Sequence, residues 1–304
     1  MILPDFYGRF RCKASACQHT CCRGWDIDID DVTADYYQQL EGPLGGAIRQ
    51  HIAEGPDGWH FCLTAEGNCP FLRPDGLCQL IRQAGDDILC DICALHPRFF
   101  QVVENGSSQV VENGSSQAIE LGGVGLCCEA ACELLLSETG PLTFCDSETG
   151  RSIGSLAQLL KWLDYPLPRK GLTYEPATAE KDHERLLAVL GRTEPIDDAW
   201  TAQLKALQAQ TANSAGSTAL TGDTGTAGRY QHIYDYIFYR QLETFADVPS
   251  DFLATYAGRS TDFIALTAAA TGDLPEAVRR WSEQIEYDTD NVALLKKAAA
   301  AGEF

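Results

Sequence analysis

The sequence predicts an α+β fold that is mainly α, with a cysteine-rich, metal-binding N-terminal domain containing short strands and a helical C-terminal half. Two observations predict it. All 13 cysteines lie between Cys12 and Cys145, together with most of the turn-forming residues, whereas leucines at helical spacing mark the chain that follows. We therefore expect a cysteine-rich metal domain, a helical segment, a flexible linker and a helical C-terminal region, spanning 1–145, 146–210, 211–228 and 229–304.

Short elements separated by turns are predicted in the cysteine-rich domain. Residues 25–30 alternate apolar and acidic side chains, which is the period of a half-exposed strand. A short helix is expected over 33–40 and a second one over 78–89. Gly67-Asn68 and Pro74-Asp75-Gly76 are turn signals between these elements.

Amphipathic helices are predicted in residues 146–210. An apolar stripe at i, i+3, i+4, i+7 spacing runs from Leu156 to Leu163 and ends before two prolines. A leucine cluster over 186–190 indicates a second helix closed by Gly191. Asp197 is a capping residue for a third helix, whose apolar positions are Trp200, Leu204 and Leu207.

Beyond residue 210 the pattern changes twice. Residues 211–228 are rich in Ala, Gly, Ser and Thr and bury too little to order themselves, so we interpret them as a flexible linker. Residues 230–245 carry six aromatic side chains, which favours a helix that packs in the core. Asp273 with Glu276 then forms a capping-box-like start for another helix, and a last one is expected over 291–300.

One segment is duplicated. Residues 101–108 read QVVENGSS, and residues 109–116 repeat this octapeptide letter for letter. Two copies are too few for a solenoid. We interpret the repeat as a lengthened hairpin or loop without a function of its own.

Charge and hydropathy exclude some partners. The formal net charge of −20 repels phosphate backbones, so nucleic acid is not expected as a partner. No run approaches the ~20 apolar residues that span a bilayer, and the N-terminus lacks the apolar core of a signal peptide. We therefore expect a cytoplasmic protein without a membrane partner, in which thiols remain reduced.

The cysteine spacing indicates metal binding. In a reducing compartment dense cysteines more often hold metal than form disulfides or scattered buried thiols. Cys12-x4-Cys17-x3-Cys21-Cys22 places four thiols within eleven residues, so they can converge without closing long loops. Further candidates are Cys69, Cys78, Cys90, Cys93, Cys127 and Cys128.

The choice of metal is less specific than the prediction of a metal. Thiolates favour zinc, copper(I) and iron–sulfur clusters. Structural zinc commonly uses two Cys-x2-Cys pairs, and here only Cys90-x2-Cys93 has that spacing. Because a cluster tolerates irregular spacing, we favour iron–sulfur and keep zinc as the alternative. No dinucleotide-binding G-x-G-x-x-G, P-loop or G-x-S-x-G motif is visible.

These motifs resemble a known family. The stretches that carry the resemblance are Pro4-Asp-Phe-Tyr7, Phe10-x-Cys12-x4-Cys17-x3-Cys21-Cys22-x-Gly24-Trp25, Ile27-x-Ile29-Asp30, Cys69-x-Phe71-Leu72, Gly76-Leu77-Cys78, Cys93-x3-Pro97-Arg98, Leu126-Cys127-x-Glu129-Ala130 and Ser282-x2-Ile285-Glu286. They resemble the flagellin lysine-N-methylase family, which shares its cysteine pattern with a broader zinc- or iron-chelating group. Here Cys128 stands where proline is usual in that family.

The resemblance implies an activity and a ligand set. It implies a cysteine-bound 4Fe–4S cluster and methyl transfer from S-adenosylmethionine to lysine side chains of flagellin or a similar protein. The positions that match the family pattern, and are therefore the predicted metal ligands, are Cys12, Cys17, Cys21, Cys22, Cys69, Cys78, Cys93 and Cys127. The other five, Cys62, Cys90, Cys128, Cys132 and Cys145, are expected to be core thiols.

Two rival functions stay open at this point. One is a non-catalytic metal-binding module, either a zinc or iron carrier or a cluster-based sensor. The other is a structural zinc domain that serves as a scaffold for a helical, partner-binding half. Binding of S-adenosylmethionine separates the enzyme from both rivals.

Overall fold

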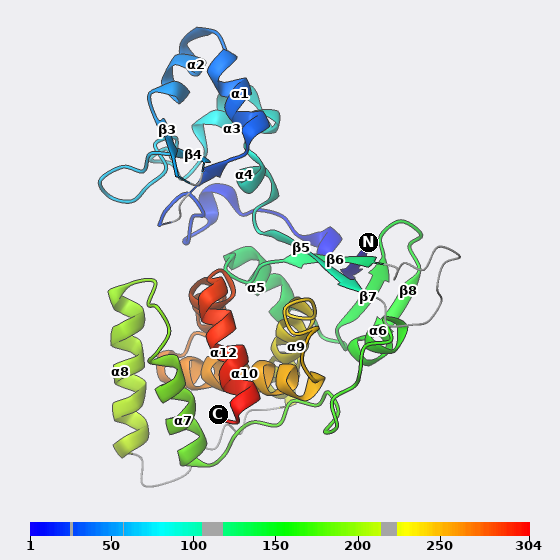
Figure 1. Cartoon of the computed structure of the whole chain (residues 1–304). Helices are drawn as coiled ribbons and strands as arrows, with labels where there is room; N and C mark the ends of the chain where they lie inside the picture. The colour runs from blue at the N-terminus through cyan, green and yellow to red at the C-terminus, as the bar shows by residue number, and fades with distance from the viewer. Residues whose placement is uncertain (25–26, 57, 105–117, 214–223) are drawn as a thin grey trace. The chain divides into compact units, whose positions relative to one another are not determined.

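A computed structural model describes residues 1–24, 27–56, 58–104, 118–213 and 224–304 (Figure 1). The chain divides into two compact units. We call Arg11–Phe99 the inserted unit, because Met1–Phe10 and Phe100–Phe304 together form the other, which we call the helical unit. This division follows compactness, whereas the segments 1–145, 146–210, 211–228 and 229–304 follow cysteine content and composition and stay predictions.

The fold is α+β and mainly α, as the sequence predicts. In the inserted unit a three-stranded antiparallel sheet of order β2-β4-β3 lies beside short helices. Its elements are η2 (Ala14–Ala16), β2 (Asp28–Ile29), α1 (Asp31–Gln39), α2 (Gly42–Arg49), β3 (Ile52–Gly55), β4 (Gly58–Phe61), α3 (Gln79–Ala84), η3 (Asp86–Ile88) and α4 (Asp91–Leu95).

The predicted helix over 78–89 is broken in the structure. Helix α3 ends at Ala84, because Gly85 adopts a φ of +84° that other residues rarely reach, and the short 3-10 helix η3 follows. The helix predicted over 33–40 is confirmed as α1. The carboxylate of Asp30 caps it by accepting a 2.8 Å hydrogen bond from the Thr33 amide.

The helical unit contains a five-stranded sheet of order β5-β6-β1-β7-β8. Strand β1 lies in its middle, parallel to β6 with Ile2 opposite Leu121, and antiparallel to β7 with Leu3 opposite Cys145. The elements up to the last strand are β1 (Ile2–Pro4), η1 (Tyr7–Arg9), β5 (Arg98–Glu104), β6 (Ala118–Val124), α5 (Glu129–Leu136), β7 (Thr143–Asp146) and β8 (Ser152–Ser155).

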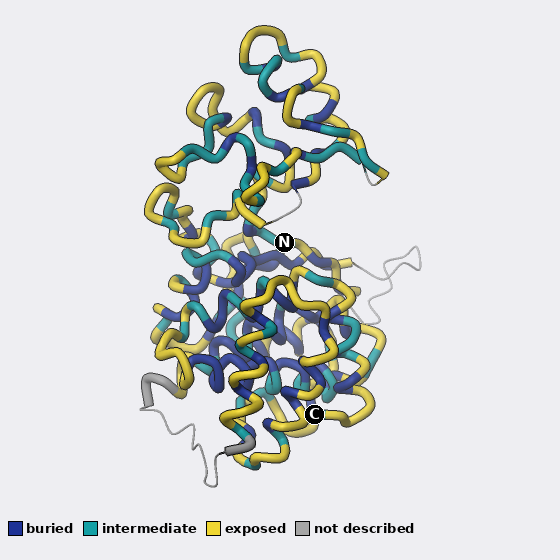
Figure 2. The backbone as a smooth tube through the Cα atoms, turned by 90° about the vertical axis from the view of Figure 1, so that its left-hand side faces the viewer, coloured by how far each residue is buried: buried dark blue, intermediate teal, exposed yellow. Residues whose placement is uncertain are grey.

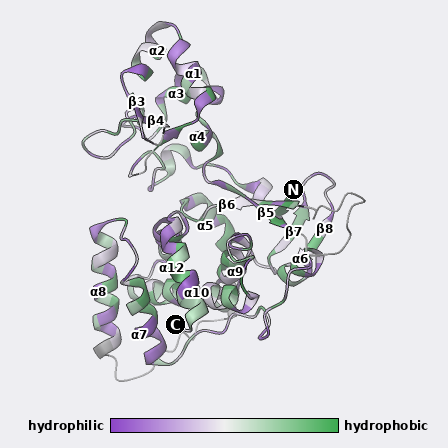
Figure 3. Ribbon diagram, viewed as in Figure 1, coloured by the Kyte–Doolittle hydropathy of each residue, from purple (hydrophilic) through white to green (hydrophobic). Residues whose placement is uncertain are grey.

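Helices form the rest of this unit, and its core is built around α10, which packs against α7, α9, α11 and α12. Figure 2 shows buried backbone concentrated among these helices, and Figure 3 shows hydrophobic stretches in α5 and α10. Their bounds are α6 (Leu156–Trp162), α7 (Glu180–Leu190), α8 (Asp198–Asn213), α9 (Thr224–Arg240), α10 (Ser250–Thr271), α11 (Leu274–Trp281), η4 (Ser282–Glu286) and α12 (Thr289–Ala301).

Aromatic residues of α9 anchor the helices to the sheet. The buried Tyr239 hydroxyl donates to the carbonyl oxygens of Ile2 (3.0 Å) and Gly122 (2.8 Å), on β1 and β6. The Tyr236 hydroxyl lies 2.8 Å from both the amide and the carbonyl of Val124. The interpretation of residues 230–245 as a core-packing aromatic segment is confirmed, although α9 itself ends at Arg240.

Two sequence predictions fall partly outside the described residues. Of the expected linker 211–228, residues 211–213 belong to α8 and 224–228 to α9, while 214–223 are not described. Of the duplicated octapeptides, 101–104 belong to β5 and 105–116 are not described. Across the described ranges, no helix combines the length and apolar character that crossing a membrane requires.

Candidate metal centre

Five cysteines meet in the core of the inserted unit. Cys69 and Cys90 are buried members of this core, and the other three thiols pack against it partly buried. Each of the five influences the ionisation of at least one other, so they lie within electrostatic range. We call this group the thiol cluster: Cys22, Cys69, Cys78, Cys90 and Cys93.

Backbone hydrogen bonds bring the first three members together. The Cys69 amide donates to the Cys22 carbonyl at 2.8 Å, which fixes two segments far apart in the sequence side by side. Cys78 pairs with Leu72 in an isolated antiparallel bridge and then forms the N-cap of α3. The turn between Leu72 and Cys78 is the one that the Pro74-Asp75-Gly76 signal predicts, and it returns the chain to the cluster.

Helix α4 supplies the last two members. Cys90 is its N-cap, and the Cys93 amide donates to the Cys90 carbonyl at 3.0 Å, so both thiols lie on one turn and are hydrogen-bonded to each other. The carboxylate of Asp30, which caps α1, also accepts a 3.0 Å hydrogen bond from the Asp91 amide at the start of α4. Burial opposes ionisation of Asp30, but the hydrogen bonds from Asp91 and Thr33 lower its pKa below the ordinary value.

A tyrosine fixes the segment that leads into α4. The Tyr37 hydroxyl donates to the carbonyl of Ile88 at 2.6 Å, and its side chain is fully buried. Burial, with the nearby Cys90 and Cys93 thiols, raises the pKa of Tyr37, so the phenol stays neutral and keeps its donor proton. Such indirect contacts hold ligand-bearing segments in place in many metal sites.

Three of the five thiols in the cluster have a raised pKa, and two have a lowered one. Burial raises the pKa of Cys69 to about 12 and also raises that of Cys78, with neighbouring thiols adding to both. A hydrogen bond with Cys90 and burial raise the pKa of Cys93. Hydrogen bonding with Cys21 lowers the pKa of Cys22 to about 7 against its burial. Several thiolates can therefore coexist here only if a cation offsets their repulsion.

The donor chemistry fits a thiophilic metal. All five groups are sulfurs, which suit zinc, copper(I) and iron–sulfur clusters. Among the residues that the structure describes, no group of three or more His, Cys, Asp or Glu side chains is already arranged to hold a metal ion. The thiols thus lie in one core, but their sulfurs do not converge on a common point. Metal binding would have to draw them together, as is usual where ligation and folding are coupled.

The other predicted ligands are not part of the core that holds the thiol cluster, although Cys21 is hydrogen-bonded to Cys22. Cys12, Cys17 and Cys21 belong to the N-terminal part of the inserted unit, where the Cys12 sulfur accepts from the Ala14 amide at 3.3 Å and the Cys17 thiol donates to the His19 carbonyl at 3.3 Å. Cys12 and Cys21 are exposed. Cys127 belongs to the helical unit. The structure thus brings together Cys22, Cys69, Cys78 and Cys93 of the eight predicted positions.

Cys90 is the member that the family pattern did not select. Its Cys-x2-Cys spacing with Cys93 is the signal that could have found it. Of the remaining four cysteines, Cys132 is a fully buried thiol that donates to the Leu126 carbonyl at 2.7 Å, which agrees with a core role. Cys128 and Cys145 are half-buried and Cys62 is exposed, so none of these three is a fully buried core thiol.

Cys127 has charged neighbours of its own. Burial raises its pKa to about 12, while a hydrogen bond with Tyr287 and the positive charge of Arg240 act in the opposite direction. Cys127 directly precedes Cys128, the N-cap of α5. This cysteine is therefore placed among polar groups from the C-terminal helices.

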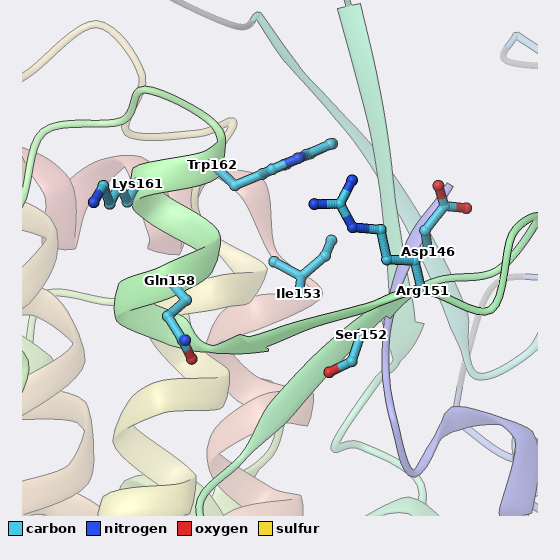
Figure 4. Close-up of a pocket in the computed structure, with 7 residues that line it drawn as sticks. All are labelled: Asp146, Arg151, Ser152, Ile153, Gln158, Lys161 and Trp162. Atoms are coloured by element: carbon cyan, nitrogen blue, oxygen red, sulfur yellow. The ribbon is translucent and has the colours of Figure 1, made fainter.

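A surface cavity of about 320 Å³ lies on the helical unit, beside β8 and α6. In Figure 4, Trp162 and Arg151 point toward one another over Ile153, whereas Lys161 points away from them. Its lining contains a single carboxylate, Asp146, and neither a thiol nor an imidazole, so it offers no donor set for the expected metal.

The described fold defines the class: an α+β protein with a small unit, carrying a cluster of thiols, inserted into a mainly helical one. The chain is 33% identical over 108 residues to the lysine-N-methylase of Salmonella typhimurium, which covers 34% of this chain and 27% of that protein. It is 32% identical over 108 residues to the lysine-N-methylase of Salmonella choleraesuis, with the same coverage. The flagellar biosynthetic protein FliU of Salmonella muenchen is 31% identical over 108 residues, covering 34% of this chain and 64% of that protein.

These relatives confirm the resemblance to the flagellin lysine-N-methylase family over about a third of the chain. The chain spans about a quarter of the length of the lysine-N-methylases that it matches. No protein-family model matches the chain. No solved structure matches it either.

Proposed function

We propose that this chain is a cytoplasmic protein-lysine N-methylase that transfers methyl groups from S-adenosylmethionine to flagellin or a similar protein and holds a 4Fe–4S cluster through its cysteines. The relatives named lysine-N-methylase support the methylase activity. The relative named for flagellar biosynthesis supports a flagellar substrate.

The observation that carries the metal part of this proposal is the thiol cluster. Four of its five members occupy positions that the family pattern selects, and they come from segments scattered between Cys22 and Cys93. Gathering five thiols in the core of one small unit offers a set of soft sulfur donors whose deprotonated forms a cation would stabilise. Cys22, Cys69, Cys78 and Cys93 are the residues that would hold the metal, and Cys90 would support or replace one of them.

The chemistry of the reaction sets what the chain must provide. A bound cluster could supply an iron site at which S-adenosylmethionine is held. The target amine must be neutral to accept a methyl group, although the pKa of a free lysine is about 10.4. The chain's formal charge of −20 favours approach of a lysine-bearing surface of the substrate.

A structural zinc site is the second candidate, and one observation favours it. Cys90 and Cys93 lie on one turn at the start of α4, hydrogen-bonded to each other, which is the Cys-x2-Cys arrangement that zinc uses. Together with Cys69 and Cys78 they would complete an all-thiolate tetrahedral set. In that case the chain would be a metal-binding module rather than a methylase.

Anaerobic purification separates these functions. We expect a brown protein with iron and acid-labile sulfide, which binds S-adenosylmethionine in calorimetry and transfers labelled methyl groups to flagellin. A colourless protein with one bound zinc and no heat of S-adenosylmethionine binding would replace the methylase with the zinc module. Flagellin whose lysines have been acetylated is the matched substrate control, because it should accept no methyl groups.

A further inference from the structure

The surface cavity beside β8 and α6 has two walls that local hydrogen bonds hold in place. The Ser155 amide donates to Gln158 Oε1 at 2.8 Å, and the Ser155 side chain accepts from the Gln158 amide in return. Gly154 leaves room for this exchange, because its φ is +98° and a Cβ there would collide with the Gln158 side chain. The junction between β8, which carries Ile153, and α6, which carries Trp162, is therefore fixed.

The walls present an aromatic ring and an aliphatic side chain to the cavity. The leucines of α6 are buried in the core, which leaves Trp162 at the end of the helix 39% exposed. Figure 4 shows Trp162 and Arg151 pointing toward one another over Ile153. The cavity of about 320 Å³ is the size of a small ligand pocket in other proteins. It can thus hold a flat apolar group beside a guanidinium.

The charges around the cavity favour an anion. Arg151 is exposed, and within the described ranges its guanidinium forms no ion pair, although the chain has 43 acidic and only 23 basic residues. The Asp146 carboxylate accepts hydrogen bonds from the amides of Glu148 (2.9 Å) and Thr149 (3.3 Å), which offset part of its charge. Lys161 is a second cation in the lining, although it points away from Trp162. A cationic ligand would be repelled by Arg151.

We propose that this cavity binds a small aryl carboxylate, with its ring against Trp162 and Ile153 and its carboxylate on the Arg151 guanidinium. The planar fork of a guanidinium matches the two oxygens of a carboxylate, and the exposed indole suits a flat ring. A phosphate fits less well, because its greater charge exceeds that of one guanidinium and is repelled more strongly by Asp146. The site shares no residue with the thiol cluster, so it does not depend on the proposed function.

The test titrates the full-length chain with 3-phenylpropionate and follows binding by saturation-transfer NMR, which detects a bound ligand whatever its heat of binding. We expect a Kd of about 1 mM or tighter. The alcohol 3-phenylpropan-1-ol keeps the ring and lacks the charge, so it should bind about tenfold more weakly or worse. The phosphate ester 2-phenylethyl phosphate should also bind more weakly than the acid.

Two variants assign the two walls. Arg151→Gln should weaken binding of the acid about tenfold and leave binding of the alcohol unchanged. Arg185→Gln is the matched control, because it removes an exposed arginine of α7 in the same unit, and it should bind the acid as the unmodified chain does. Trp162→Leu should weaken binding of both the acid and the alcohol, because it removes the aromatic wall.

Four results would overturn the inference. They are no binding of the acid at concentrations tenfold above the expected Kd, equal affinities for the acid and the alcohol, equal losses in Arg151→Gln and Arg185→Gln, and tighter binding of the phosphate ester than of the acid. Arg151 is exposed, so its variant should keep the melting temperature of the unmodified chain. These readouts involve neither metal nor methyl transfer, so failure of the proposed function would leave them unaffected.

Discussion

Cys69 is the residue on which the thiol cluster depends most directly. It is nearly fully buried, and its amide donates a hydrogen bond to the Cys22 carbonyl. Burial, together with the nearby thiols of Cys22, Cys78 and Cys90, raises its pKa. We expect Cys69→Ala to lose most of the bound metal and to lower the free energy of unfolding by more than about 2 kcal/mol, because ligation and folding are coupled. Metal analysis and urea unfolding measure both effects.

Cys62→Ala is the matched control for this substitution. Cys62 is exposed, lies just after β4 in the same unit and is outside the family pattern. The control should keep its metal content and its unfolding midpoint. A soluble Cys69→Ala variant with the metal content of the unmodified chain would contradict the assignment of Cys69 as a ligand.

Asp235 on α9 makes the stability of the helical unit depend on pH. Burial raises the pKa of its carboxyl from 3.8 to about 7, against a hydrogen bond from Gln231 that lowers it. Because the folded state holds this proton more tightly than the unfolded chain does, the contribution of Asp235 to stability is greatest at low pH. It is lost progressively as the pH rises from about 4 to about 7.

We therefore expect Asp235→Asn to be more stable than the unmodified chain at pH 8, by on the order of 2 kcal/mol for this half-buried group, and nearly equal to it at pH 4. Asparagine keeps an oxygen that can accept the 2.8 Å hydrogen bond from Gln231. Urea unfolding at the two pH values measures the difference. Glu184→Gln, at an exposed position of α7, should show no such gain, and an equal gain from both substitutions would refute the burial argument.

At residue scale, the family pattern selects four of the five members of the thiol cluster, and their role as metal ligands stays a prediction. Cys90 was set aside because the family pattern omits it, although its spacing to Cys93 was visible. The partners of Cys127 could not be predicted, because Arg240 and Tyr287 come from α9 and the turn after η4, and only the folded chain brings these segments together.

Among the secondary-structure elements, α1 and α4 depend on one side chain. The two carboxylate oxygens of Asp30 accept hydrogen bonds from the first turns of both helices, through the amides of Thr33 and Asp91. We expect Asp30→Ala to cost about 1–2 kcal/mol and to weaken metal binding, because α4 carries Cys90 and Cys93. Asp31→Ala, which removes an exposed carboxylate of the same turn, should cost far less. If Asp30→Ala and Asp31→Ala lost metal affinity equally, the hydrogen bonds of Asp30 to the two helices would not be what holds α4 in place.

Helix α10 shows why sequence patterns fail to predict some helices. It is the longest described helix, and yet no helix was predicted over 250–271. Residues 260–268 are buried without interruption, so no polar face alternates with an apolar one and the 3.6-residue period is lost. By contrast, α6, α7, α8 and α11 each keep a polar face or a capping residue, and all four were predicted.

The central sheet was predicted even less well, for a different reason. Strands β1, β7 and β8 have three or four residues each, too few to show alternation. Their pairing joins residues separated by most of the N-terminal half of the chain, and Ile2 opposite Leu121 is one such pair. Local patterns contain no information about such partners.

At the scale of the molecule, two units with separate cores should respond differently to metal removal. We expect a chelator to raise hydrogen exchange at the amides of β4 and α3 in the inserted unit and to leave α9 and α10 of the helical unit protected. Exchange followed by mass spectrometry measures both. The same chelator added to metal-free protein is the control. An equal rise in hydrogen exchange across both units would show that the two cores do not respond separately to metal removal.

The position of β1 in the middle of the five-stranded sheet has a consequence for the order in which the chain folds during synthesis. Strand β1 is made before Arg11–Phe99, whereas its neighbours β6 and β7 are made only after the whole of that segment. That segment contains the partners of its own core, so it can fold while the five-stranded sheet still lacks every strand except β1. During translation the Arg11–Phe99 unit can then fold first, and Met1–Phe10 reaches its final place only when β6 and β7 have been made.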